Sequence, residues 1–357
     1  MREDRREFLR TLAATALAST AGAHSLFAGR GRYAIAYTSF AVRLQRGRDL
    51  IKGAGAPALP AEAFIDLCRS FGADGCQLGL SQVASTEASA LDALKRRLGE
   101  AGLFLELSVG AKNLEDPERF ADVAAIARRL GAVCLRVALL SGRRYETFPT
   151  MASWRVFADH WRQTLPRLKA ALDRERLPVG IENHKDWRAD ELVALLRSVD
   201  SPYLGACVDF GNNVALLEDP LDTATALAPY AVTTHLKDMA VRPYEGGFEL
   251  SEVPLGTGLC PLAKMVEVLR AARPDVPLSL EMITRDPLKV PHLDDAYWAT
   301  YEKRDEARIE AFRTRVLSRA ATGPLPRISG MTYEAMVATE DDNVRRSTAF
   351  ARKNLPV

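Results

Sequence analysis

Four short segments of the chain each end an apolar run on residues that could carry chemistry. They read IENH, VDFGN, HLKD and LSLEM, and they begin at residues 181, 208, 235 and 278. Like charges gathered in one cleft raise one another's pKa, so a group of carboxylates needs a compensating cation. An oxygen-rich set with one nitrogen and no thiolate favours a divalent ion, Mn²⁺ first and Mg²⁺ or Co²⁺ as options, over a structural zinc site. The segments offer three carboxylates and one imidazole: Glu182, Asp209, His235 and Glu281.

A buried salt-bridge network is the alternative explanation for the same charges. Arg136 and Lys237 would then serve as counter-ions, and no metal would be required. The residue types alone leave both explanations open.

Such a site could support proton abstraction next to a carbonyl, which is the reaction implied by a family resemblance given below. A divalent ion chelated by a carbonyl and its neighbouring hydroxyl would polarise the carbonyl and acidify the adjacent C–H. Two carboxylates on opposite sides of the substrate could then remove a proton from one face and return one to the other. His184 offers an imidazole suited to general base work, and a hydrogen bond that supports a ligand is an equal option. Lys237 could stabilise an oxyanion or pair with Asp238.

The elements that must position these residues alternate between strands and helices. Eight β-like runs are separated by amphipathic stretches, which is the arithmetic of a (β/α)8 barrel. A doubly wound open sheet fits the alternation almost as well, but no glycine-rich phosphate loop follows the first strand. A long polar helix is expected over 295–320. The predicted strands cover residues 33–40, 74–80, 103–110, 132–139, 178–183, 203–210, 230–237 and 277–283.

Strand alternation predicts which side chains face the barrel interior, because successive side chains point to opposite faces and the active site lies at the strand ends. It turns Asn183 and Lys185 away from the site. Trp187, in the next loop, is a candidate for stacking on a sugar. Long insertions at 41–60 and 239–262 would frame the mouth of the site. The residues expected to face inward are Gln77, Glu106, Arg136, Glu182, His184, Asp209, His235, Lys237 and Glu281.

In this order the four segments resemble the metal-site signatures of the sugar phosphate isomerase/epimerase-like family of xylose-isomerase-type TIM barrels, over about residues 32–320. The resemblance implies a small-molecule carbohydrate substrate. It also implies that Glu182 and Glu281 form the acid/base pair. The metal ligands that it implies are Glu182, Asp209, His235 and Glu281, and the candidate substrate-binding residues are Gln77, Glu106, Arg136, Asn212 and Trp187.

The resemblance does not choose the reaction. The family includes ketose 3-epimerases, hydroxypyruvate isomerases, inosose isomerases and dehydratases, and lyases that act on 3-keto-glycosides by β-elimination. Asn212 and Asn213 stand where ketose epimerases tend to carry a substrate-binding histidine. Two further alternatives are an exported sugar-binding protein without turnover and a DNA-repair endonuclease with a trinuclear zinc site. The endonuclease needs many histidines, and this chain has 5.

Residues 1–30 resemble a twin-arginine export signal. Arg5 and Arg6 precede a small apolar stretch that ends in Ala21-Gly22-Ala23. An amphipathic helix is the alternative. The stretch is shorter than the roughly 20 apolar residues of a stable membrane anchor. We therefore expect a periplasmic or otherwise exported protein that meets free or oxidised sugars more readily than phosphorylated ones.

Composition and length complete the expectation. A net charge of +2 over 357 residues gives no reason to expect a nucleic acid or an anionic membrane as partner. The 5 cysteines are widely spaced and suit buried core positions. The predicted plan is the signal at 1–30, an α/β barrel at 31–320 and a helical extension at 321–357. The extension could pack on the barrel or on another subunit, which would make the protein a homo-oligomer.

Overall fold

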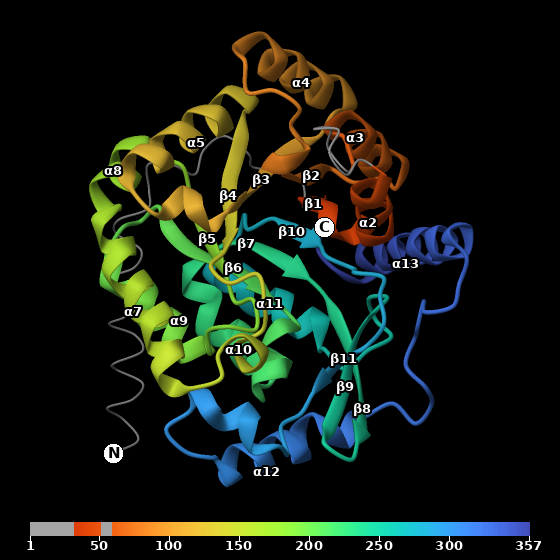
Figure 1. The fold of residues 1–357 in the computed structure, drawn as a ribbon. Helices are drawn as coiled ribbons and strands as arrows, with labels where there is room; N and C mark the ends of the chain where they lie inside the picture. Colours follow the sequence, from red (N-terminus) through yellow and green to blue (C-terminus); the bar gives the residue numbers. More distant parts are fainter. Residues whose placement is uncertain (1–31, 51–58) are drawn as a thin grey trace. The chain divides into compact units, whose positions relative to one another are not determined.

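The chain folds into a closed barrel of eight parallel strands. The computed structural model describes residues 32–50 and 59–357. Each barrel strand pairs with the next, and the last of them, β10, returns to β1 through Tyr33 and Leu278. This closure excludes an open sheet and confirms the predicted (β/α)8 barrel (Figure 1). The barrel strands are β1 (Tyr33–Ala36), β2 (Gly75–Gly79), β3 (Phe104–Gly110), β4 (Ala132–Ala138), β5 (Val179–Glu182), β6 (Leu204–Asp209), β7 (Ala231–Leu236) and β10 (Leu278–Leu280).

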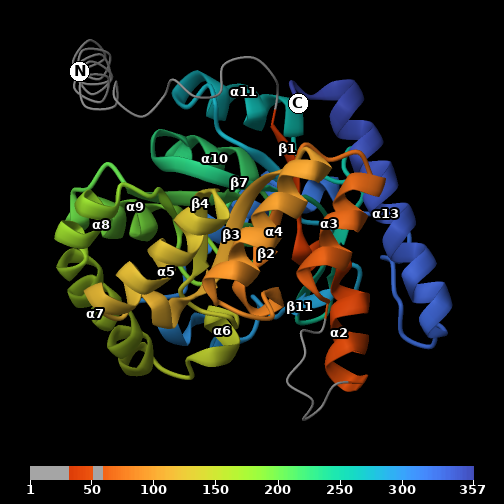
Figure 2. The same cartoon turned by 90° about the horizontal axis from the view of Figure 1, so that it is seen from above.

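Helices alternate with the strands and surround them (Figures 1 and 2). Local sequence sets their ends. In α5, Asp116 accepts hydrogen bonds from the amides of Glu118 and Arg119, and Gly131 ends the helix at φ 78°. The helices are α2 (Ala41–Leu50), α3 (Ala61–Ser70), α4 (Ala88–Ala101), α5 (Pro117–Leu130), α6 (Arg144–Thr147), α7 (Met151–Arg167), α8 (Lys169–Glu175), α9 (Ala189–Val199), α10 (Pro220–Leu227) and α11 (Leu262–Ala272), with 3-10 turns η1 (Tyr37–Phe40), η2 (Leu80–Gln82), η3 (Ala111–Leu114), η4 (Asn212–Leu216) and η5 (Ala228–Tyr230).

A small antiparallel sheet follows β7 directly. It consists of β8 (Asp238–Tyr244), β9 (Gly247–Val253) and β11 (Leu288–Val290). The sequence indicated a long insertion here but not its strands. The carboxylate of Asp238 accepts hydrogen bonds from the amides of Gly256, Gly258 and Cys260, at 2.8 to 3.0 Å, and so fixes the loop that leaves β9. Asp238 is thereby engaged by backbone, and the predicted alternative that it pairs with Lys237 is wrong.

The prediction of one long helix over 295–320 is also wrong. The segment is divided into η6 (Asp295–Thr300), α12 (Glu306–Arg315) and η7 (Leu317–Arg319). Tyr297 and Trp298 are buried and turn the chain inward at η6, and Asp305 caps a new helix by accepting from the amide of Arg308. A regular helix would have left these aromatic rings on a polar surface.

The C-terminal extension forms one helix, α13 (Tyr333–Asn354), which lies beside α2 (Figure 2). Its side chains fasten it to the first and last parts of the barrel. Glu340 accepts from the amide of Val42 at 2.6 Å, and the hydroxyl of Thr348 is 2.9 Å from that of Tyr33. The extension therefore packs on the barrel of its own chain.

Three further predictions concern the export signal, membrane-spanning helices and the cysteines. The predicted export signal lies outside the described residues. Within residues 32–50 and 59–357, no helix is long and apolar enough to cross a bilayer. All 5 cysteines are buried and free, as their apolar settings predicted.

Candidate metal centre

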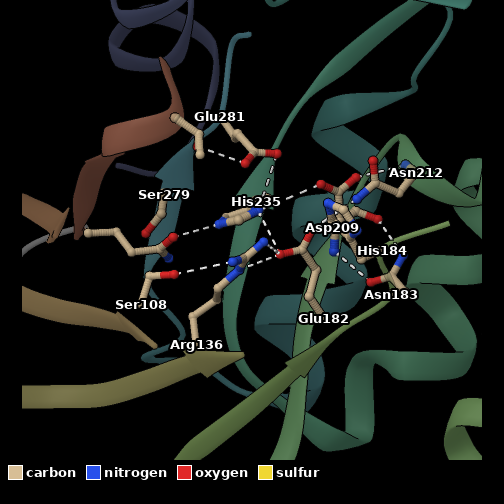
Figure 3. Close-up of polar contacts among 12 residues, drawn as sticks. Ser108, Arg136, Glu182, Asn183, His184, Asp209, Asn212, His235, Ser279 and Glu281 are labelled. Carbon is tan, nitrogen blue, oxygen red and sulfur yellow. Dashed lines mark hydrogen bonds and ion pairs between the residues drawn. The ribbon is translucent and has the colours of Figure 1, made fainter. Parts of the chain in front are cut away.

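The four predicted ligands meet at the carboxyl ends of neighbouring strands. Glu182 ends β5, Asp209 ends β6, His235 lies near the end of β7, and Glu281 follows β10. All four are buried, and one ligand atom from each lies within 4.8 Å of the others. His235 stands at the centre of the group (Figure 3), with its Nδ1 3.4 Å from Glu182, 3.4 Å from Glu281 and 3.7 Å from Asp209.

The hydrogen bond on the far side of His235 orients the ring. Its Nε2 is 2.8 Å from Oε1 of Gln77, whose Nε2 in turn donates to Glu106 at 2.8 Å. Since the amide oxygen of Gln77 only accepts, Nε2 of His235 donates this hydrogen bond, and Nδ1 is the ring nitrogen turned toward the carboxylates. That Nδ1 makes no hydrogen bond to any described residue and faces three carboxylates. Burial alone would lower the pKa of His235, but its acidic neighbours hold it well above the usual range, so Nδ1 is protonated in the metal-free site. Three carboxylates and this nitrogen fit a divalent cation, which would replace the proton on Nδ1.

Asp209 is likewise held on one side and left without an aligned hydrogen bond on the other. Its Oδ1 accepts from the amides of Gly211 and Asn212, at 2.8 and 2.7 Å. Its Oδ2 makes no aligned hydrogen bond within the described part of the chain, although Nζ of Lys237 is 3.0 Å away. One oxygen is thus fixed by the turn after β6, and the other is turned toward the cluster.

Gln77 and Glu106 were predicted to bind substrate, and their observed hydrogen bonds support His235. Their side chains are 1% and 0% exposed and lie beneath His235. Glu106 accepts from Gln77, from Thr233 at 2.7 Å and from Ser279 at 2.9 Å. Burial raises the pKa of Glu106, and these donors oppose the rise. Both residues position the imidazole, and contact with a substrate stays a prediction.

The salt-bridge network proposed as an alternative is present around the same ligands. Arg136 pairs with Glu182, and Lys237 lies 2.5 Å from Glu281. Burial alone would raise the pKa of Glu182, but Arg136 and His235 hold it well below the usual range. Burial also opposes ionisation of Glu281, and His235 and Lys237 overcome it. Arg136 and Lys237 contact Oε2 of Glu182 and Oε2 of Glu281, which are the same oxygens that lie 3.4 Å from Nδ1 of His235. A bound cation would therefore share these oxygens with the two basic side chains.

Asn212, a predicted substrate-binding residue, supports one of the four predicted ligands. It is fully buried, and its Nδ2 donates to Oε1 of Glu182 at 2.9 Å. Its Oδ1 accepts from Lys185, and Nζ of Lys237 lies 3.3 Å from the same oxygen. Asn212 therefore links Glu182 to two ammonium groups.

Lys185 is a site residue that strand alternation placed on the wrong side. Its φ is 68°, a left-handed conformation that ends the alternation after β5 and turns the side chain inward. Burial, together with the neighbouring charges of Lys237 and Arg285, lowers the pKa of Lys185 to about 8. Asn183 is buried and joins β5 to β6 by accepting from the amide of Asp209 at 2.8 Å, so its side chain bonds the backbone of the next strand.

Two more charged residues reach the site from outside the barrel strands. Glu252 on β9 is buried, and Arg285, which follows β10, grips it through Nε at 3.2 Å and Nη2 at 2.6 Å. Nζ of Lys237 is 3.8 Å from Glu252. Neither residue was predicted, because no periodic pattern connects an insertion or a loop with a strand end.

His184 and Trp187 have different outcomes. Nδ1 of His184 donates to the carbonyl of Leu140 at 2.8 Å, and burial lowers the pKa of the ring to about 4. The ring is therefore neutral at pH 7, as a general base requires. Trp187 is fully buried, with its ring centroid 5.1 Å from that of Trp154 and 6.0 Å from that of Phe157. It is a core residue, and its predicted stacking on a sugar is wrong.

A closed α/β barrel with an acidic cluster at its strand ends defines a class of enzyme scaffold whose site lies at that rim. The chain belongs to the xylose isomerase-like TIM barrel family, whose model matches residues 65–307. This match confirms the resemblance to sugar isomerases and epimerases that the four segments indicated.

Solved structures agree with this fold. A D-psicose 3-epimerase in the presence of D-fructose has a TM-score of 0.58 and 13% identity, covering 91% of this chain and 100% of its own. An L-ribulose 3-epimerase has a TM-score of 0.54 and 15% identity, covering 91% and 94%. The IOLI protein with a bound zinc atom has a TM-score of 0.52 and 12% identity, covering 82% and 100%.

Curated proteins are also similar in sequence, and one of them has a named activity. The 3-oxo-isoapionate decarboxylase of Pectobacterium atrosepticum is 27% identical over 182 residues, which is 50% of this chain and 62% of that protein. The chain thus matches less than two thirds of this relative's length.

Proposed function

We propose that the protein is a divalent-metal-dependent enzyme that abstracts a proton next to the carbonyl of a free or oxidised sugar, as isomerases and epimerases do. The observation that carries this proposal is the position of Nδ1 of His235. This nitrogen faces three buried carboxylates and makes no hydrogen bond to a described residue. Glu182, Asp209, His235 and Glu281 would hold the ion, with Mn²⁺ preferred and Mg²⁺ or Co²⁺ as options. When bound, such an ion supplies Lewis acidity at the carbonyl.

Glu182 and Glu281 are the residues we assign to proton transfer. Their lowered pKa values keep both ionised near neutral pH, so that either can accept a proton. Each is held in place by a neutral donor as well as by a cation. Oγ1 of Thr38 donates to Glu281 at 2.7 Å, and Nδ2 of Asn212 donates to Glu182. His184, neutral and adjacent, is a second candidate base.

Decarboxylation of a 3-oxo sugar acid is the second candidate. The similarity to 3-oxo-isoapionate decarboxylase favours it. Loss of carbon dioxide from a 3-oxo acid leaves an enolate, as proton abstraction does, so the same residues would serve either reaction.

One panel experiment separates these reactions. The Mn²⁺-loaded protein is incubated in deuterated water with ketoses, 3-keto-glycosides and 3-oxo sugar acids. Deuterium uptake without fragmentation indicates isomerisation or epimerisation, release of an aglycone indicates β-elimination, and release of carbon dioxide indicates decarboxylation. A protein that binds sugars but catalyses none of these, and whose Glu182→Gln and Glu281→Gln variants keep that affinity, would be a binding protein and would refute the proposal.

Metal content and location are tested separately. Elemental analysis of the purified protein, and a thermal shift with Mn²⁺ or Co²⁺, should both be positive. We also propose that the protein is exported through the twin-arginine route. A reporter fused behind residues 1–30 should be exported, and it should remain in the cytoplasm when Arg5 and Arg6 are replaced by Lys. Retention in the cytoplasm with both arginines intact would refute export.

A further inference from the structure

Lys185 carries a buried charge that the protein leaves largely unsatisfied. The side chain is 3% exposed, and its only hydrogen bond to a described residue is to Oδ1 of Asn212. That oxygen is neutral and is shared with Lys237. An ammonium group has three N–H donors, and a buried cation without an anionic partner is costly.

The other cations of the site are paired. Arg136 pairs with Glu182, Lys237 with Asp209 and Glu281, and Arg285 with Glu252. Lys185 makes no ion pair with any carboxylate in the described ranges. A divalent ion in the cluster would add positive charge beside it. Lys185 is thus the cation of the site that lacks an anionic partner among the described residues, although Asn212 links it to Glu182.

The backbone holds Lys185 in this position at a cost. A non-glycine residue at φ 68° is strained, and such strain persists only where the surroundings impose it. The amide of Arg144 donates to the carbonyl of Lys185 at 3.0 Å and anchors the turn. Asn212 then connects the ammonium to Glu182 by two successive hydrogen bonds. The side chain is therefore fixed beside the ligand cluster.

We propose that the sugar substrate is an acid and that Lys185 binds its carboxylate next to the ligand cluster. This inference rests on the proposed function, because it assigns the substrate class of the same site. Arg285 is a second donor: Glu252 occupies its Nε and Nη2, and its Nη1 makes no hydrogen bond to a described residue. A carboxylate fits better than a phosphate, since the nearby carboxylate of Glu252 would repel a dianion more strongly.

The test compares two probes that differ only at C1, where D-fructose has a hydroxymethyl group and 2-keto-D-gluconate has a carboxylate. Affinities of the Mn²⁺-loaded protein are measured by isothermal titration calorimetry for the wild type, for Lys185→Met and for Lys185→Arg. We expect the wild type to prefer 2-keto-D-gluconate by about 10- to 100-fold. Lys185→Met should lose the preference for 2-keto-D-gluconate and keep its affinity for D-fructose. Lys185→Arg should retain most of the preference.

Several results overturn the inference. These are equal affinities of the wild type for the two probes, an equal loss of both affinities in Lys185→Met, or no binding of either probe by the metal-loaded protein. Failure of the proposed function is distinguishable, because it shows as absent Mn²⁺ binding in a titration made first without sugar. A structural role for Lys185 is excluded if Lys185→Met binds Mn²⁺ as the wild type does and melts at or above the wild-type temperature.

Discussion

The floor and the rim of the site are built differently. Beneath His235 the floor is a set of buried hydrogen bonds around one carboxylate, made by Gln77, Thr233 and Ser279 to Glu106. Above it the rim is a set of charges that come from loops and from the small sheet, namely Lys185, Lys237, Glu252 and Arg285. Under the proposed function, the floor would fix the geometry of a metal ligand, and the rim would set the charge that a substrate meets. Substrate preference should therefore change through the rim and metal binding through the floor.

The largest effect is expected where floor and rim meet, at Glu281. Replacing Glu281 by Gln removes a ligand oxygen charge and the partner of Lys237, so kcat should fall about 10²- to 10⁴-fold. The measurement is deuterium uptake by a substrate found in the panel. The matched control is Glu310→Gln, whose side chain is 65% exposed and pairs with Arg313. An unchanged kcat in Glu281→Gln would show that Glu281 has no part in catalysis.

The floor is tested by Gln77→Ala. Without the amide oxygen of Gln77, Nε2 of His235 loses its acceptor, and Mn²⁺ affinity should fall about 10- to 100-fold. Calorimetric titration with Mn²⁺ measures it. Gln82→Ala is the control, because Gln82 is also buried but bonds the backbone of Gly79 and Leu59. If both variants bound Mn²⁺ as the wild type does, the floor would have no part in metal binding.

The rim is tested by Glu252→Gln. A neutral amide leaves Arg285 and Lys237 without their shared carboxylate, which should cost about 1–3 kcal/mol in the free energy of unfolding, measured with urea. Glu249→Gln on the same strand breaks a pair with the half-exposed Arg327 and should cost about 0–1 kcal/mol. Equal costs would mean that the rim is an ordinary surface. Mn²⁺ affinity should change less in Glu252→Gln than in Gln77→Ala.

The smallest effect is the pH dependence of the same pair. Burial alone would raise the pKa of Glu252, but Arg285 and Lys237 lower it from 4.5 to about 2. Because the folded-state pKa is depressed, the stability from Glu252 is present above pH 4.5 and is lost as pH falls toward 2. The difference in unfolding free energy between wild type and Glu252→Gln should therefore shrink between pH 5 and pH 3, in urea titrations at each pH. A constant difference would contradict the assignment.

Strand alternation was enough to predict the floor and the ligand cluster. It is a local rule with a period of two residues, and it holds along a strand such as β5 or β7 because the pleat enforces it. It predicted that Glu182, His235 and Glu281 face the interior, although it could not distinguish Gln77 and Glu106 as supports from residues that contact substrate. Depth along the barrel, which separates these roles, depends on strand register.

The rim could not be predicted by the same rule. The inward position of Lys185 was not predicted, because its left-handed backbone conformation reverses the direction of the side chain. Glu252 and Arg285 escaped because their meeting depends on how β9 packs over the barrel, which is a long-range contact without local periodicity. Trp187 was misassigned because an aromatic residue after a strand end suits a core position as well as a binding one.

The pairing of β1 with β10, which closes the barrel, has a consequence for folding during synthesis. β1 and β10 are joined there, and α13 contacts both sides: Glu340 and Thr348 hold Val42 and Tyr33, and Asn343 donates to Thr284 at 2.9 Å. α13 follows every barrel strand in the chain, so it is synthesised after them. We expect a nascent chain that ends before residue 333 to form its barrel without this clasp, with the amide of Val42 and the hydroxyl of Tyr33 open to water.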